Sequence, residues 1–124
     1  MHFGNILEKA KQNDTFRTVL ATGDNVQVVV MSIPPEGEIG EEVHPDNDQV
    51  LLLADGGGTA VLDGKEKPFE PGDLVLVPAG TLHNFVAGKD GMKVVTTYSP
   101  PHHAEGTVHA TKAEADAAEA GDED

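Results

Sequence analysis

Apolar residues in this chain occur in short runs and alternating stretches that are typical of β-strands, and turn-forming residues separate one run from the next. The predicted strands cover residues 15–21, 25–33, 39–44, 49–54, 59–62, 65–69, 74–77, 84–87 and 92–98. About nine short strands at such close spacing favour an antiparallel β-barrel or sandwich over a helical bundle.

Glycine-containing turns separate these strands. Asp63-Gly64 predicts a two-residue hairpin turn, and Pro71-Gly72 suits a type II turn because proline presets φ and glycine tolerates positive φ. Residues 55–58 and 88–91 are expected to form further turns. The run Leu74–Val77 is too short for a helix and predicts a buried strand.

Two short helices are expected outside the strands. Residues 5–12 form one, with Asn5 as its N-cap, and residues 111–120 form the other because Thr111 and Glu114 have the spacing of a capping box. We therefore expect one domain in three parts. These are a helical segment over residues 1–14, a barrel over 15–99, and a Pro/His segment with a short helix and an acidic tail over 100–124.

Composition narrows the possible partners of this 124-residue chain. Its 22 acidic and 8 basic residues give a formal charge of −14, which disfavours nucleic acid and anionic membrane surfaces. The absence of cysteine excludes disulfides and thiolate metal sites, so any metal must be held by histidine, carboxylate or amide groups. The chain contains neither a long apolar run nor a signal-peptide pattern, and we expect a cytoplasmic protein.

Candidate chemistry is concentrated in two places, and the first is the stretch from Glu42 to Gln49. Glu42 and His44 are two residues apart, so on a strand their side chains share a face. The turn-forming residues 45–48 break the register, which allows Gln49 to converge with them. Gln49 shares its own face with Leu51 and therefore points into the interior, where a buried amide needs a partner.

The second place is His83, which follows a turn and stands at the entrance of a strand. Each of these residues also has an ordinary structural interpretation. His44 could be a surface turn residue beside Pro45, and Glu42 could be a solvated strand end. Glu41 is the rival to Glu42, but on a regular strand it faces the opposite side.

The joint spacing of these residues resembles the two sequence motifs of the cupin family. The first spacing is Glu42-x-His44-x4-Gln49-x6-Gly56, and the second is Gly72-x5-Pro78-x-Gly80-x2-His83. The resemblance covers roughly residues 33–99 and implies an all-β fold: a single cupin barrel of the double-stranded β-helix or jelly-roll type, with short helices at both ends. It also implies a site inside the barrel and, as in other small cupins, a homodimer.

The chain departs from the family pattern at three positions. Glu42 occupies the place of the first histidine, Gln49 occupies the place of the glutamate, and Asn84 directly follows His83 instead of lying at the usual offset. Carried over residue by residue, the implied metal ligands are Glu42, His44, Gln49 and His83. This mixed nitrogen and oxygen set suits one divalent transition metal, either Fe, Mn, Co, Ni or Zn, and leaves a net positive charge.

A third group of candidates follows the barrel. The segment from Tyr98 to His103 could fold over the barrel mouth and supply an acid or base, or it could serve packing or a dimer contact. The candidate catalytic residues are Glu42, Tyr98, His102 and His103.

The expected function is that of a cupin that binds a divalent metal and a small-molecule ligand. We expect metal-assisted isomerisation of a small oxygen-rich metabolite such as a sugar, uronate, keto acid or enediol. A non-catalytic binding or sensing barrel and a metal-dependent dioxygenase are the alternatives, because one fold hosts many functions.

Overall fold

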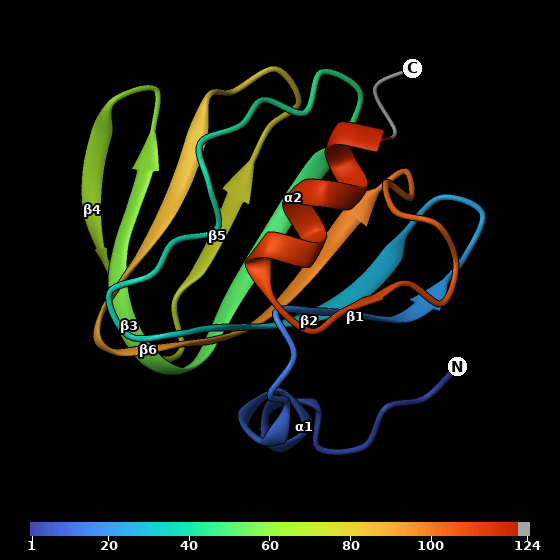
Figure 1. Cartoon of the computed structure of the whole chain (residues 1–124), viewed down its shortest axis with the longest axis horizontal. Coiled ribbons are helices and arrows are strands. Elements are labelled where there is room, and N and C mark those ends of the chain that lie inside the picture. The colour runs from blue at the N-terminus through green and yellow to red at the C-terminus, as the bar shows by residue number, and fades with distance from the viewer. Residues whose placement is uncertain (122–124) are drawn as a thin grey trace.

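The computed structural model describes residues 1–121, so most of the predicted acidic tail, residues 122–124, lies outside the described residues. The elements in chain order are α1 (Ile6–Gln12), β1 (Arg17–Thr22), β2 (Gln27–Ile33), β3 (Asp48–Leu62), β4 (Lys65–Phe69), β5 (Leu74–Val77), β6 (His83–Ser99), β7 (Val108–His109) and α2 (Lys112–Gly121). The strands within residues 1–121 pair in the order β4-β3-β6-β2-β1-β7. Strand β5 pairs with the first part of β3, which β4 does not reach. All pairs are antiparallel, and the predicted all-β barrel with a short helix near each end is confirmed (Figure 1).

Strands β3 and β6 form the longest strand pair of the barrel, because they pair along almost their whole length. The sequence predicted turns at residues 55–58 and 88–91, and both predictions are wrong, since each stretch lies within one long strand. Two register shifts occur in β3, between Leu53 and Asp55 and between Gly56 and Gly58. Glycine permits these bends: a Cβ at Gly56 would collide with the carbonyl of Gly91 across the pair. The glycines therefore bend the strands without ending them.

Two predicted turns are confirmed. Asp63 and Gly64 both have positive φ, 49° and 80°, as a two-residue hairpin turn between β3 and β4 requires. At Pro71-Gly72, the N–H of Asp73 donates to the carbonyl of Glu70 at 2.9 Å and Gly72 has a φ of 91°.

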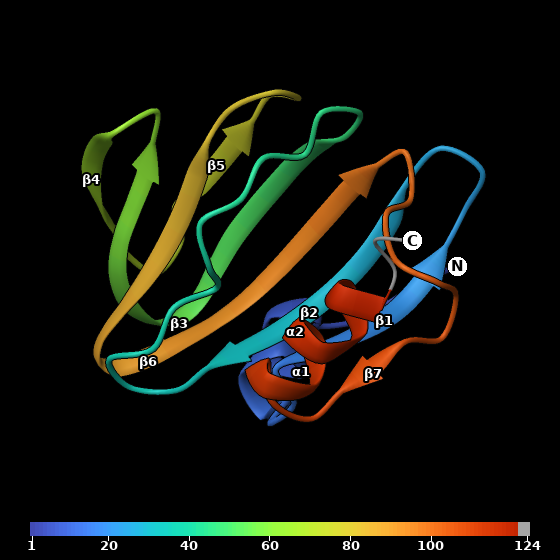
Figure 2. The ribbon, with the colours of Figure 1, turned by 45° about the horizontal axis from the view of Figure 1, so that its top comes forward.

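The predicted strand over residues 39–44 does not form. This part of the chain makes only two isolated bridges, Glu38 with Val86 and Glu42 with His83, and Figure 2 draws it as coil in teal between β2 and β3. Prolines 34 and 35 remove backbone donors before it, and Gly40 has a φ of 120°, so a regular ladder is interrupted on this side of β6. Glu42 is therefore placed by one bridge and not by a strand.

Strand β5 has the predicted bounds but not the predicted burial. Leu74 and Leu76 are 61% and 55% exposed, whereas Val77 is 2% exposed. The strand pairs with β3 alone, so its side chains alternate between the interior and the outer face. An apolar run was thus insufficient to predict burial on both faces.

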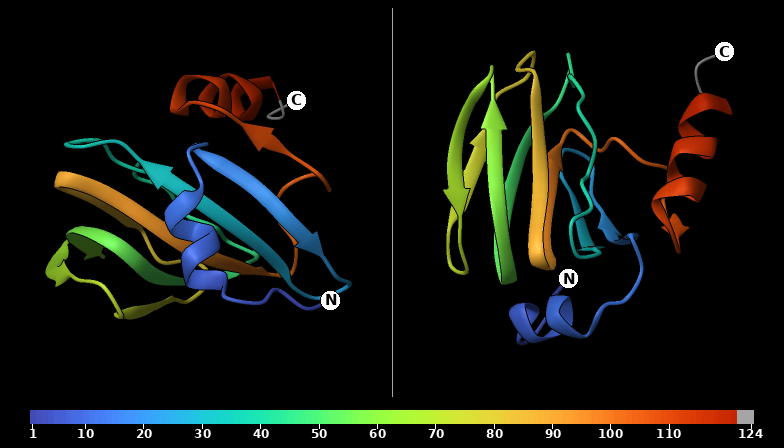
Figure 3. Two further views of the ribbon diagram at one scale, coloured as in Figure 1. Left: turned by 90° about the horizontal axis from the view of Figure 1, so that it is seen from below. Right: turned by 60° about the vertical axis from the view of Figure 1, so that its left-hand side comes forward.

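The main core lies between the inner faces of β2, β3 and β6, with Met31, Leu51, Phe85 and Tyr98 among its largest side chains. α1 packs against the outer face of the sheet, where Ala10 joins a second small cluster. Figure 3 shows that α1 and α2 lie on different sides of the strands. None of the helices among residues 1–121 combines the length and apolar character needed to cross a membrane.

The two helix starts differ from each other. Asn5 was predicted to cap α1, but it has a φ of 52° and its side chain makes no capping hydrogen bond. The capping box of α2 forms as predicted: Thr111 Oγ1 accepts the N–H of Glu114 at 3.2 Å, and the N–H of Thr111 donates to Glu114 Oε2 at 3.1 Å.

Candidate functional site

Three predicted ligand residues meet inside one end of the barrel. The ligand atoms of Glu42, His44 and His83 all lie within 4.8 Å of one another. Glu42 Oε1 is 3.2 Å from His44 Nε2 and 4.0 Å from His83 Nε2. Both histidines are buried and Glu42 is partly exposed. Residues from two separate segments thus form one compact cluster.

His83 is held in a single orientation. It is the first residue of β6, and its Nδ1 lies 2.8 Å from the carbonyl oxygen of Thr81. In the neutral ring Nδ1 therefore carries the proton and donates it, which leaves the lone pair of Nε2 facing the cluster. A backbone acceptor on the far nitrogen is the usual support for a metal-binding histidine.

The two halves of the cluster are tied together by backbone hydrogen bonds. The N–H groups of Glu42 and His83 donate to each other's carbonyls at 3.0 Å. The N–H of Gly80 donates to the carbonyl of His44 at 2.9 Å, and Asp48 Oδ1 accepts the N–H of Ala79 at 2.9 Å. The turn before His83 thus holds the segment that carries Glu42 and His44.

Gln49, the fourth predicted ligand, is 1% exposed and lies on the inner face of β3. Its Nε2 donates to Thr96 Oγ1 at 3.0 Å, and Thr96 Oγ1 donates to the carbonyl of Val50 at 2.8 Å. These bonds use the donor side of the amide and leave its oxygen without a partner. Oε1 is therefore the atom of the Gln49 side chain that could accept a contact from a ligand.

The buried atoms of the cluster fit a metal ion. Within residues 1–121, His83 Nε2 and Gln49 Oε1 are buried without a hydrogen-bond partner. His44 Nε2 has the Glu42 carboxylate nearby but not in hydrogen-bond geometry. Each unpartnered buried polar atom costs about 1–3 kcal/mol, and a divalent cation among Glu42, His44 and His83 would satisfy the two histidine nitrogens. Two imidazoles, a carboxylate and an amide oxygen match the preferences of a transition metal.

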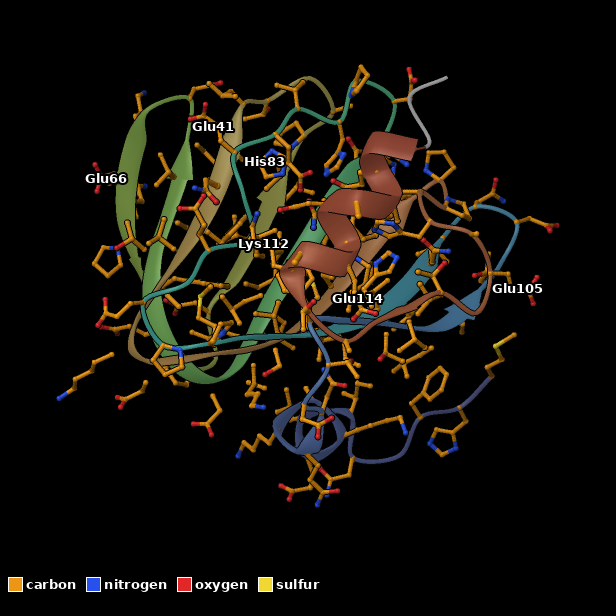
Figure 4. All side chains as sticks on the ribbon, viewed as in Figure 1. Glu41, Glu66, His83, Glu105, Lys112 and Glu114 are labelled. Carbon is orange, nitrogen blue, oxygen red and sulfur yellow. The ribbon has the colours of Figure 1, made fainter. Side chains whose placement is uncertain are left out.

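The electrostatics of Glu42 agree with a ligand role. Burial alone would raise the pKa of this carboxyl group, but neighbouring His44 and His83 hold the pKa below its ordinary value. Glu42 is therefore ionised at neutral pH. Glu41, the rival considered from the sequence, is exposed and outside the cluster. Its position is visible in Figure 4 beside the labelled His83.

The segment after β6 lies over the site. The rings of His102 and His44 have centroids 4.5 Å apart, and His102 stacks on Tyr98 at 5.4 Å. Gln27 fixes this segment, because its Oε1 accepts the N–H groups of His102 and His103 at 3.2 and 3.0 Å and its Nε2 donates to the carbonyl of His103 at 2.8 Å. His102 thus contacts His44, and both His102 and His103 line the cavity beside Glu42 and His44.

Burial determines the protonation of this segment. It lowers the pKa of His103 to about 3, and for the more exposed His102 partial burial and neighbouring His44 lower the pKa. Burial also raises the pKa of the Tyr98 phenol. At neutral pH, His102, His103 and Tyr98 are therefore all uncharged.

A cavity of about 460 Å³ adjoins the cluster. Glu42 and His44 line one part of it, His102 and His103 line another, and His109 of β7 with Glu119 of α2 complete the wall. A small molecule in this space would contact the metal ligands and the histidine segment together.

Sequence reasoning missed two buried polar residues that build this region. Gln27 is fully buried and holds the histidine segment, and Arg17 is 2% exposed behind the cavity wall. Arg17 is the only arginine among the eight basic residues, and it stands inside an apolar strand. A single arginine within an apolar strand could have indicated a buried charge with a specific role. A glutamine at the start of a strand gives no such indication.

The fold and the cluster define a cupin, and the comparisons with known proteins agree. The profile of the Cupin domain family matches residues 29–98, so the chain belongs to the cupin family, as its motifs predicted. The chain is 44% identical over 123 residues to an uncharacterized protein of Bacillus subtilis, YrkC, and this match covers 93% of the chain and 66% of YrkC. It thus spans just under two thirds of the length of that relative.

Two further similarities are to a solved structure and to a named bacterial protein. The crystal structure of BH2720 from Bacillus halodurans superposes with a TM-score of 0.91 at 37% identity, covering 94% of this chain and 93% of that one. The pectin degradation protein KdgF of Dickeya dadantii is 25% identical over 85 residues, which cover 68% of this chain and 76% of KdgF.

Proposed function

We propose that this protein is a metal-dependent cupin enzyme that isomerises a small oxygen-rich metabolite. The observation that carries the proposal is the cluster of Glu42, His44 and His83, with buried unpartnered ligand atoms, beside a cavity of about 460 Å³. The similarity to a pectin degradation protein supports a sugar-derived ligand.

Glu42, His44, Gln49 and His83 would hold one divalent metal, which supplies a Lewis acid for a carbonyl or enolate oxygen of the ligand. Glu42 is the only anionic residue of this set, so the centre keeps a positive charge. Such a centre favours ligands that carry or develop negative charge on oxygen.

His102 is the residue best placed to move a proton. Its ring lines the cavity and lies against His44, and Gln27 fixes its backbone. A neutral imidazole removes a proton from the carbon beside a carbonyl and returns it to the neighbouring carbon. The substrate loses and regains one proton, and no oxidant is consumed. Glu42 serves the metal, and Tyr98 is a packing partner of His102.

Solvent deuterium exchange tests this proposal. The protein is loaded with Fe(II), Mn, Co, Ni or Zn and incubated in D₂O with a panel of sugars, uronates and keto acids. We expect NMR to show deuterium at the carbon beside the carbonyl of at least one compound, and chelation of the metal should abolish the incorporation. Ligand binding without exchange would indicate the non-catalytic binding barrel, and oxygen uptake would indicate the dioxygenase.

A variant pair links the activity to the cavity. His102→Gln should abolish exchange while it leaves the metal content unchanged, because His102 is outside the ligand cluster. His2→Gln, at an exposed histidine far from the cluster in sequence, is the matched control and should retain full exchange. Equal rates in the two variants would contradict the role of His102.

A further inference from the structure

Arg17 is a buried cation that the metal centre does not use. It lies on β1 and is 2% exposed, and its guanidinium carbon sits 5.4 Å from the centre of the Phe16 ring. Its NH1 nitrogen is 3.2 Å from Nδ1 of His109 and 3.7 Å from Oε1 of Glu119. Both of these residues line the cavity, so the guanidinium lies directly behind the cavity wall.

The protein satisfies this guanidinium only in part. Arginine carries five N–H donors, and a buried charge needs partners for them. Nε of Arg17 is buried and has no hydrogen-bond partner among residues 1–121. The carboxylate of Glu119 is 3.7 Å away, and its side chain is 44% exposed, so the ion pair is long and partly solvated.

A ligand anion could replace Glu119 as the partner of Arg17. Glu119 belongs to the last turns of α2, whose only fully buried side chain among the described ones is Ala115. Burial and the nearby negative charge of Glu42 raise the pKa of Glu119, so its anionic form is less favourable here than in water. An incoming anion could make a shorter, charge-assisted contact with Arg17 than Glu119 does.

We propose that Arg17 is the anion subsite of the cavity and that a carboxylate of the ligand displaces Glu119 from it. The ligand would then be a small acid with its carboxylate at Arg17 and a carbonyl or hydroxyl oxygen toward Glu42, His44 and His83. This inference rests on the proposed function only in taking the cavity as the ligand site.

A purely structural role for Arg17 makes the opposite prediction for Glu119. If the ion pair only fastens α2 to β1, then Glu119→Gln loosens the cavity wall and weakens binding or leaves it unchanged. If Glu119 competes with the ligand, the same substitution tightens the binding of anions and leaves neutral ligands unaffected.

The experiment compares galacturonate with galactose, which lacks the carboxylate, on the metal-loaded 124-residue chain by calorimetry at constant ionic strength. For the wild type we expect galacturonate to bind roughly tenfold more tightly than galactose, the effect of a hydrogen bond to a charged group. Arg17→Gln should remove this preference, and Arg17→Lys should retain part of it.

Glu119→Gln is the decisive variant because it alters a partly exposed side chain and leaves the buried arginine in place. It should tighten galacturonate binding by about three- to tenfold with no change for galactose. Glu66→Gln makes the same change of charge on β4, away from α2 in Figure 4, and should leave both affinities at the wild-type level.

Equal affinities for the two sugars, including no binding of either, would overturn the proposal. Loss of affinity in Glu119→Gln would also overturn it, even if Arg17→Gln fails to fold. The outcome is separable from the proposed function. A galacturonate preference without deuterium exchange would retain the anion subsite and reject the isomerase. Exchange on neutral sugars alone would retain the isomerase and reject the anion subsite.

Discussion

The two halves of the Glu42, His44 and His83 cluster are built in different ways. His83 opens a long strand, pairs with Leu62 of β3, and has its ring fixed by Thr81. Glu42 and His44 lie outside the named strands, on a segment that one bridge and a few turn hydrogen bonds hold. His83 is therefore part of the sheet, whereas the segment with Glu42 and His44 is only attached to it.

The two halves therefore contribute differently: the sheet fixes the position of His83, and the irregular segment supplies the carboxylate of Glu42. The sheet holds His83 in place, so that position tolerates little change without loss of the site. The attached segment carries Glu42 where the family motif has a histidine. A metal held by this cluster would therefore receive the negative charge of Glu42 from the less regular half.

The largest effect is expected from the sheet-bound half. His83→Ala should reduce the metal content from about one ion per chain to almost none, because losing a ligand costs more than the 10- to 100-fold of an outer-shell change. Elemental analysis of protein purified without chelator measures this. His2→Ala is the control, and metal retained by His83→Ala would exclude the proposed ligand set.

The attached half is tested by a neighbouring pair of glutamates. Glu42→Gln keeps the shape and removes the only anionic ligand, so metal affinity should fall roughly 100-fold. Glu41→Gln removes the same charge from an exposed neighbour and should change affinity less than about twofold. Competition with a fluorescent chelator gives both values. Similar losses in the two variants would mean that net charge, and not ligation, controls the affinity.

His103, in the segment that follows β6, predicts a pH dependence of stability in the metal-free protein. Burial lowers the pKa of His103 from 6.5 to about 3, so below pH 6.5 the unfolded chain takes up a proton that the folded chain refuses. The free energy of unfolding should therefore fall as the pH decreases from 6.5 toward 3. The slope for a half-buried group is about 0.5–1 kcal/mol per pH unit, below the full single-proton value.

Urea unfolding at several pH values measures that slope. His103→Gln should have a shallower slope than the wild type, while His2→Gln should match the wild type. Parallel curves for the wild type and His103→Gln would show that His103 does not account for the acid sensitivity.

The smallest effect is expected at the hydrogen bonds that join the two halves. Asp48→Ala removes the acceptor of the Ala79 N–H and should lower the free energy of unfolding by about 1 kcal/mol. Metal affinity should decrease only a few-fold, because the Gly80 to His44 bond remains. Asp46→Ala, an exposed residue of the same turn, is the control for denaturant unfolding. An equal stability for both variants would show that this bond is dispensable.

Much of the fold could be predicted because local chemistry determines it. The turn at Asp63-Gly64 and the capping box of Thr111 and Glu114 form as predicted, since each depends on neighbouring residues only. The glycines of residues 55–58 and 88–91 gave the wrong result, because a glycine that ends a strand and one that bends it look alike in sequence. The distinction depends on which backbone lies across the sheet.

The sequence by itself determined the barrel and the family, and it singled out Glu42, His44 and His83, which the fold brings together, because motif spacing and strand alternation are local patterns. Only the tertiary structure decided what surrounds them. Arg17, Gln27 and Glu119 come from both ends of the chain and meet around one cavity, and no local spacing connects them. Their burial and charge, which arise from packing β1, β2 and α2 around the barrel mouth, give this site its distinguishing chemistry.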